Sequence, residues 1–254
     1  MATEDWAPVL SAIEALGRGA YERVDLDGLT DGDGALAEVA TALAEAAAAI
    51  ASRESALRQA RHDAVHRLVV AAEYRDQRTL THIERMSSYA ALLARRLGLP
   101  DREVELLREA SAMHDVGKIG IPEHILLKPG RLDDEEWEVM RQHAEIGAVI
   151  LRDTMSDLLT AGEQIARSHH ERWDGSGYPS GLSGDEIPLW GRICAIADVF
   201  DALTSERPYK RAYDAREAFA TMAEGRGTHF DPGLLDLFFE AAEDVQRIRA
   251  HLPS

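Results

Sequence analysis

The chain has 254 residues and a hydrophobic content of 45%, which is enough for one sizeable core or two small ones and excludes a largely disordered protein. With 45 acidic against 28 basic residues, the formal net charge is −17, which repels duplex nucleic acid and anionic membrane surfaces. Any anionic substrate must therefore be captured by local groups. Only 6% of the residues are aromatic and runs of β-branched residues are scarce, which predicts an all-α fold.

Residues 1–72 are predicted to form an N-terminal helical region, whose role the sequence does not indicate. Its main segment, Ala35 to Tyr74, contains no Gly or Pro and consists mostly of good helix formers, which predicts one long helix or two in series. The apolar stripe of this segment could close against a second copy or against the rest of the chain, so a homodimer through these helices is a hypothesis. Glu38 and Glu45 interrupt its most apolar part, so we expect no membrane span, and the acidic N-terminus lacks a secretory signal. We therefore expect a cytoplasmic protein.

Residues 73–254 are predicted to form a second domain, a bundle of helices with well-marked ends. One apolar pattern stops at Gly98 and Pro100, as helix C-termini commonly do. The next helix, from about Asp101, is expected to run as far as the pair His114-Asp115. Asp133 and Glu136 have the spacing of a capping box, in which each side chain bonds the other's backbone N–H. Further helices are expected around 164–170, 192–203 and 215–223, with the last beginning near Asp231-Pro232.

Several polar or bulky side chains are predicted to have roles in packing or on the surface. Trp137 is expected to anchor the core, and the single cysteine, Cys194, lies in an apolar run and is expected to be a small buried residue. Glu171 is either a partner of the neighbouring histidines or an exposed glutamate. The histidines that fit no ligand spacing are expected at the surface or at helix caps: His62, His66, His124, His229 and His251.

The chemistry of the chain is predicted from a set of histidines and aspartates. Adjacent residues on a helix project about 100° apart, so His114 and Asp115 can face one cavity. Three further imidazoles, His143, His169 and His170, follow on predicted helices. Asp198 interrupts an apolar run, where a charge is unfavourable to bury unless it is paired or bound to a metal. This list of ligands exceeds what one ion takes, so we expect two ions that share Asp115 and together promote an in-line phosphoryl displacement by an activated hydroxide.

Four motifs in order resemble the HD-GYP family over about residues 73–242. They are His114-Asp-Val-Gly-Lys-Ile-Gly-Ile-Pro122, Ile125-Leu-Leu-Lys-Pro-Gly130, His169-His-Glu-Arg-Trp-Asp-Gly-Ser-Gly-Tyr-Pro179 and Asp198-Val-Phe-Asp-Ala-Leu-Thr-Ser-Glu-Arg-Pro-Tyr-Lys210. The resemblance implies an HD-domain helical bundle that hydrolyses cyclic di-GMP or a related cyclic dinucleotide. It implies two divalent ions, Fe or Mn, since imidazole and carboxylate accept both.

The resemblance also implies roles residue by residue. One ion would be held by His82, His114, Asp115 and Asp198, and the other by Asp115, His143, His169 and His170. Lys118 would stabilise phosphate charge or protonate a leaving oxygen, with Asp201 as its resting partner. Phosphate would be gripped by Arg207 and Lys210. The signature loop with Gly175, Gly177, Tyr178 and Pro179 would offer an aromatic wall to guanine.

One position departs from the pattern of family members that bind three metals. They carry a glutamate four residues before the first histidine ligand, where this chain has Arg78. A cation there would repel a third ion, so we expect two ions and the linear dinucleotide pGpG as the main product. Two other functions are considered: a non-hydrolytic cyclic-dinucleotide receptor, which would typically have lost a ligand or Lys118, and a di-iron oxygenase of the HD superfamily, against which the signature loop and the basic pair argue.

Overall fold

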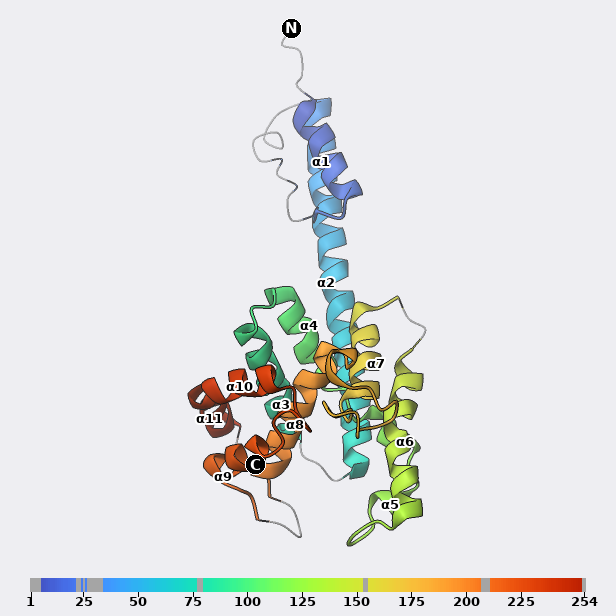
Figure 1. Ribbon diagram of the computed structural model, residues 1–254. Helices are drawn as coiled ribbons and strands as arrows, with labels where there is room; N and C mark the ends of the chain where they lie inside the picture. The colour runs from blue at the N-terminus through green and yellow to red at the C-terminus, as the bar shows by residue number, and fades with distance from the viewer. Residues whose placement is uncertain are drawn as a thin grey trace. The chain divides into compact units, whose positions relative to one another are not determined.

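The computed structural model describes residues 6–21, 24, 26, 34–76, 80–152, 155–206 and 211–252. Within these residues the regular structure is helical, and the only β-type pairing is in isolated bridges, such as the one between Asp174 and Ser183 (Figure 1). The predicted all-α fold is confirmed. The chain divides into two compact units, Met1–Val65 and His66–Ser254. The long helix α2 (Ala35–Asp76) runs across this division. The division between Val65 and His66 lies a few residues before the boundary predicted at 72/73.

The first unit is built from α1 (Ala7–Gly17) and the N-terminal part of α2. Its small core contains the buried residues Val9, Ala12, Leu26 and Ala40. Because α2 is continuous, the prediction of one long helix is confirmed. By length and composition alone, the α2 segment Ala35–Leu57, with a mean hydropathy of 1.4, could cross a membrane. Glu38 and Glu45 therefore do not prevent this segment from having the length and mean hydropathy of a membrane span, although core helices of soluble proteins can have them too.

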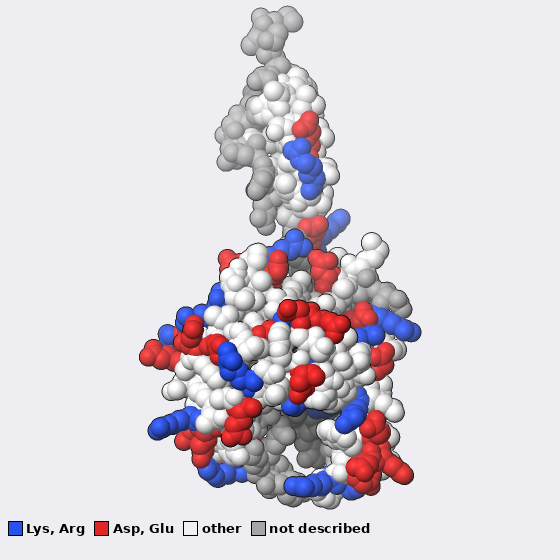
Figure 2. All heavy atoms as spheres, viewed as in Figure 1, with Lys and Arg blue, Asp and Glu red and all other residues white. Residues whose placement is uncertain are grey.

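The second unit is a helical bundle that supports the site. Its central helices are α3 (Leu80–Arg96), α4 (Asp101–Ser111), α6 (Asp134–Leu151), α7 (Asp157–Ser168) and α8 (Leu189–Thr204). Helix α3 packs on α4 and α8, α7 packs on α4, α6 and α8, and the core of α8 includes the buried run from Ile193 to Ala197. Cys194 is buried in that run, as predicted. On the face of this unit seen in Figure 2, acidic and basic side chains are intermixed.

The helix ends follow the predicted local signals. Helix α3 stops at Arg96, Gly98 takes a positive φ of 84°, and the Leu99 N–H returns to the Ala94 carbonyl at 3.1 Å. The capping box at α6 is present: Glu136 N–H donates to Asp133, and Asp133 N–H donates to Glu136, each at 2.9 Å. The remaining helices are the short α5 (Glu123–Leu126), then α9 (Ala215–Ala223), α10 (Pro232–Glu240) and α11 (Ala242–His251), with 3₁₀ turns η2 (Val116–Gly120) and η3 (Gly184–Glu186).

The segment around His114 and Asp115 differs from the prediction. Helix α4 ends at Ser111, so both residues lie in a turn that leads into η2. A side chain at Gly117 would place its Cβ 1.9 Å from the carbonyl oxygen of His143 and 2.4 Å from the Gly147 nitrogen. The chain therefore leaves the helical path because its backbone must pass directly against α6. His169 and His170 likewise lie just beyond the last residue of α7 rather than within it.

Candidate metal centre

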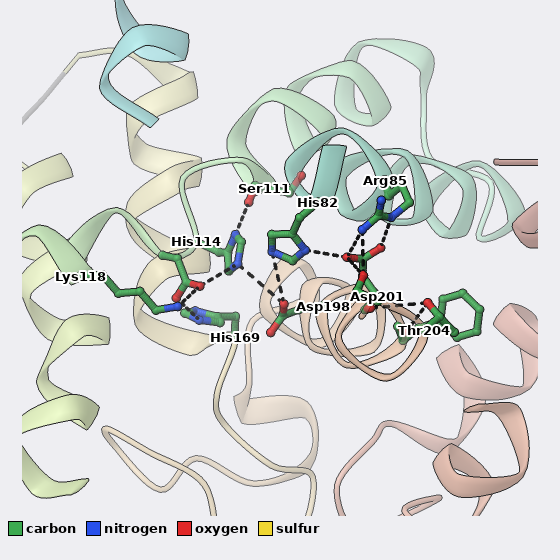
Figure 3. A network of polar contacts seen from close by, with 12 residues as sticks. His82, Arg85, Ser111, His114, Lys118, His169, Asp198, Asp201 and Thr204 are labelled. Carbon is green, nitrogen blue, oxygen red and sulfur yellow. Dashed lines mark hydrogen bonds and ion pairs between the residues drawn. The ribbon is translucent and has the colours of Figure 1, made fainter. Parts of the chain in front are cut away.

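Two groups of potential metal ligands form among the described residues, and the first joins three separate elements. His82 comes from α3, His114 from the turn after α4, and Asp198 from α8, and their ligand atoms all lie within 4.8 Å of one another. The Oδ1 atom of Asp198 lies 3.8 Å from His82 Nε2 and 3.9 Å from His114 Nε2. Figure 3 shows these three side chains pointing toward a common point.

The second group consists of Asp115, His143, His169 and His170, again with ligand atoms within 4.8 Å of one another. Asp115 Oδ1 lies 3.4 Å from His143 Nε2 and 3.8 Å from His169 Nε2. Its other oxygen, Oδ2, lies 3.2 Å from Nε2 of His114, which belongs to the first group. Asp115 therefore connects the two groups, and all seven residues predicted as ligands lie around one centre.

The backbone orients the imidazoles toward that centre. The Nδ1 atoms of His114, His143 and His169 contact the carbonyl oxygens of Ser111 at 3.0 Å, Met140 at 2.7 Å and Ala166 at 3.0 Å. Since a carbonyl oxygen only accepts, each Nδ1 carries the proton and each Nε2 presents a lone pair. In the described part of the chain, the buried Nε2 atoms of His143 and His169 have no hydrogen-bond partner. Inward lone pairs on buried, mixed imidazole and carboxylate donors fit a divalent cation.

The electrostatics of the centre favour the protonation states that bind metal. Burial alone would raise the pKa of Asp115, but Lys118 and His114 outweigh it and hold that pKa well below its usual range. Burial lowers the pKa of His143 to about 4. Burial, and then the neighbouring His169 and His143, also lower the pKa of His170. At neutral pH the aspartate is therefore ionised, and these two imidazoles are neutral.

The prediction that Lys118 pairs with Asp201 is wrong. The Lys118 ammonium donates to Asp115 Oδ2 at 2.7 Å. Asp201, which is fully buried on α8, accepts instead from Arg85 Nε at 2.6 Å and Nη2 at 3.0 Å, and lies 2.7 Å from His82 Nδ1. Asp198 and Asp201 are three residues apart and lie on the same side of α8, but Asp201 reaches the centre through His82 (Figure 3).

Arg85 is the functional residue that the sequence reasoning missed. It is buried on α3, three residues after His82. Besides its bonds to Asp201, its Nη2 donates to Ser205 Oγ at 2.8 Å and its Nη1 donates to the Leu252 carbonyl oxygen at 3.3 Å. Burial raises the pKa of Asp201, but hydrogen bonds from His82 and Arg85 outweigh it, so the carboxylate stays ionised. An arginine on the same helix face as a ligand histidine was the available signal.

The signature loop is held by buried contacts beside the ligand histidines. Glu171 is buried and accepts from the N–H groups of Ser180 at 2.7 Å and Leu182 at 3.1 Å, so it closes the loop and is not exposed. A side chain at Gly177 would place its Cβ 2.3 Å from the Arg172 nitrogen, so only glycine fits there. Tyr178, which precedes Pro179, stacks on the His170 ring at 4.7 Å.

The prediction that Trp137 anchors the core is wrong. Its side chain is 42% exposed and lies on α6 with its ring 6.4 Å from that of Tyr178. The capping box places Trp137 in the first turn of α6, where the helix face turns away from the bundle interior. Arg78, Arg207 and Lys210, which carry the predictions of ion number and phosphate binding, lie outside the described residues.

A helical bundle that gathers histidines and aspartates from distant elements around one buried centre is the arrangement expected of an HD-type domain. Residues 66–234 match the family described as HD domain. The chain belongs to that family, and the resemblance to HD-GYP proteins is confirmed.

Named relatives are similar over most of this chain. It is 46% identical over 186 residues to a cyclic di-GMP phosphodiesterase response regulator, RpfG, of Xanthomonas campestris, covering 73% of this chain and 49% of that protein. It is 43% identical over 197 residues to 3′3′-cGAMP-specific phosphodiesterase 2 of Vibrio cholerae, covering 78% of this chain and 38% of that protein. The chain thus spans less than half the length of these relatives. A crystal structure of a cyclic GMP-AMP specific phosphodiesterase of V. cholerae shares the fold, with a TM-score of 0.55, 20% identity, and coverage of 76% of this chain and 54% of that one.

Proposed function

We propose that this chain is a metal-dependent phosphodiesterase that hydrolyses cyclic di-GMP, mainly to pGpG. The observation that carries the proposal is the position of Asp115, whose two oxygens lie within 3.2 to 3.8 Å of histidines from both ligand groups. The names of relatives with 43% and 46% identity support a cyclic dinucleotide as the substrate. Because those names include both cyclic di-GMP and 3′3′-cGAMP enzymes, both compounds belong in the test.

The two ligand groups support two divalent ions, one held by His82, His114, Asp115 and Asp198, and one by Asp115, His143, His169 and His170. When bound, such ions polarise phosphate oxygens and lower the pKa of water. The donor set suits iron or manganese. Arg78 in the sequence supports two ions rather than three. Metal analysis of protein purified without air should find about two equivalents of tightly bound ion per chain, and three equivalents would contradict the proposal.

Other side chains of the chain are proposed to bind the substrate, donate a proton and orient a metal ligand. The Lys118 ammonium lies beside Asp115 and is buried, so it can offset negative charge on a phosphate or donate a proton to the leaving oxygen. Asp201 accepts a hydrogen bond from His82 Nδ1–H and so keeps His82 Nε2 directed to the centre. Arg207 and Lys210 are proposed to grip the phosphates because the surrounding net charge of −17 requires local cations.

The test is turnover of cyclic di-GMP and 3′3′-cGAMP by the full chain with Mn²⁺ or Fe²⁺, with products separated by chromatography over time. Asp115→Ala should abolish turnover and metal loading together. Lys118→Met should cut turnover by about 10²–10⁴-fold with the metal retained, as loss of a proton donor does. Lys128→Met is the matched control, because Lys128 also pairs with a carboxylate, that of Glu136 at the start of α6, and neither residue belongs to a ligand group. A metal-loaded wild type that binds but does not cleave either compound would instead make the chain a receptor.

A homodimer through the N-terminal helices is part of the proposal. Helix α2 exposes Val39, Ile50 and Leu57 in the first unit, and an apolar stripe of this kind is stabilised by a second helix. Sedimentation velocity at micromolar concentration should give a dimer mass. A single monomer mass would rule out this part of the proposal without affecting the phosphodiesterase.

A further inference from the structure

A partly exposed aromatic and cationic cluster adjoins the candidate metal centre and contains none of the seven candidate ligands. It consists of Trp137 and Arg141 on α6 and Tyr178 in the signature loop. The Arg141 guanidinium carbon lies 5.8 Å from the centre of the Trp137 ring and 5.3 Å from that of Tyr178. Residues four apart on a helix project from one face, so α6 presents the indole and the guanidinium together. We call these three residues the aromatic–arginine cluster.

The cluster is connected directly to the ligand histidines. The Tyr178 ring stacks on His170 at 4.7 Å with an interplanar angle of 27°, and lies 6.2 Å from the His143 ring. A continuous series of π systems and one cation therefore leads outward from the second ligand group to Trp137.

The Arg141 guanidinium is only weakly engaged by other protein groups. Its Nη1 donates to Glu138 at 3.1 Å, but the Glu138 side chain is 69% exposed, and ion pairs at such exposed positions are weak. Its Nε is buried and has no hydrogen-bond partner among the described residues. Because Nε is buried, the two Nη groups are the donors that a ligand could reach, and a guanidinium held over two rings by π contacts is suited to presenting them to acceptors on a planar ligand.

We propose, building on the phosphodiesterase function, that Trp137 stacks on one purine base of the cyclic dinucleotide and that Arg141 selects guanine at that position. Stacking on an aromatic side chain accepts any base, because every base has a π face. Selection needs the edge: guanine presents two acceptors, O6 and N7, to an arginine fork, whereas adenine presents an N6 donor beside N7. Stacking on Trp137 thus contributes affinity for any base, and the Arg141 guanidinium contributes specificity for guanine.

A purely structural role for the cluster leads to different expectations. A tryptophan that served only to pack α6 against the loop would be stabilised by burial, yet 42% of Trp137 is exposed to water. Replacing it would then change the stability of the fold and leave substrate affinity unchanged. The two roles can therefore be separated by measurement.

The experiment compares Trp137→Phe, Trp137→Ala and Arg141→Lys with matched controls in the full chain. Val149→Ala is a control for loss of an exposed apolar side chain on the same helix, since Val149 is 45% exposed. Arg167→Lys is the control for the arginine, since both side chains are 41% exposed and both pair with a nearby glutamate. Steady-state kinetics use cyclic di-GMP, 3′3′-cGAMP and cyclic di-AMP. Equilibrium binding is measured by calorimetry with a phosphorothioate analogue of cyclic di-GMP that resists hydrolysis.

Trp137→Ala should raise KM for cyclic di-GMP and weaken analogue binding by about tenfold, with kcat within about twofold, while Trp137→Phe should retain most of the affinity. Arg141→Lys should reduce the preference for cyclic di-GMP over cyclic di-AMP by about tenfold, because lysine lacks the rigid planar fork that directs two parallel hydrogen bonds to O6 and N7. Neither control should change these quantities.

Two kinds of failure are distinguishable. If the wild type cleaves no cyclic dinucleotide, the proposed function fails. If the wild type cleaves cyclic di-GMP but KM, analogue affinity and base preference stay within twofold in the Trp137 and Arg141 variants, the base-binding role of the cluster is refuted and the phosphodiesterase stands. A lowered melting temperature with unchanged KM would assign the cluster to packing and would also overturn the inference.

Discussion

The buried pair of Arg85 and Asp201 allows a sharp test of how the fold supports the metal centre. Asp201→Asn keeps the shape of the side chain but removes its charge. Arg85, which is 2% exposed, would then be a buried cation facing an amide. Breaking a buried ion pair by removing one partner costs about 3–5 kcal/mol. Because asparagine can still accept a hydrogen bond, we expect a loss of about 3 kcal/mol in the free energy of unfolding.

The same substitution should weaken metal binding separately from stability. His82 Nδ1 lies 2.7 Å from Asp201, and loss of such a carboxylate partner typically lowers metal affinity by about 10–100-fold. Adding Arg85→Met to Asp201→Asn removes both buried charges, so the double variant should recover most of the stability but not the metal affinity. Arg95→Met, which disrupts the exposed Arg95–Glu105 pair on the surface of the bundle, is the control and should change stability by less than about 1 kcal/mol.

Denaturant unfolding at fixed metal concentration and competitive metal titration provide the two measurements. The reasoning would be refuted by an Asp201→Asn variant whose unfolding free energy stays within 0.5 kcal/mol of the wild type. It would also be refuted if the double variant regained metal affinity along with stability, because His82 would then not depend on the carboxylate.

Three further predictions concern the turn, the loop and pH. Gly117→Ala should destabilise the fold by more than about 3 kcal/mol and prevent metal loading, since the new Cβ would lie 1.9 Å from the His143 carbonyl oxygen. Gly17→Ala is the control and should be neutral or slightly stabilising, because nothing lies within 4 Å of its Cβ position. Thermal melts and metal analysis compare the two variants. Glu171→Gln should cost about 1–2 kcal/mol in denaturant unfolding, because two N–H groups lose a charged acceptor, and an unchanged midpoint would contradict the role assigned to it. Burial lowers the pKa of His229 to about 4, so the unfolded chain binds more protons below pH 6.5 and stability should fall as the pH drops from 6.5 toward 4. Wild type should lose about 1–2 kcal/mol more than His229→Asn between pH 7 and pH 5, and parallel pH profiles would show that His229 is not responsible.

Local sequence signals were sufficient wherever a feature depends on neighbouring residues. The α6 capping box, the glycine after α3 and the proline at the start of α10 were all predicted, because caps are set by backbone geometry within a few positions. Most residues that gather at the candidate metal centre were also identified from the sequence, since a lone aspartate in an apolar run, such as Asp198, is costly to bury without a partner or a metal. The resemblance to the HD-GYP family supplied His82, which spacing alone did not identify.

Contacts between distant segments were decided only by the tertiary structure. Which cation faces Asp201 depends on how α3 lies against α8. Because 116 positions separate Arg85 from that carboxylate, nothing near Asp201 in the sequence pointed to Arg85, and the pairing with Lys118 that the resemblance implied was wrong. Trp137 lies in the first turn of α6 and is exposed there, and the turn at His114 depends on the close approach of Gly117 to α6. The sequence by itself determined which groups are costly to bury and where the helices with local capping signals begin or end. Packing alone decided which of those groups meet, because that outcome depends on the geometry between elements and not on the order of residues within one.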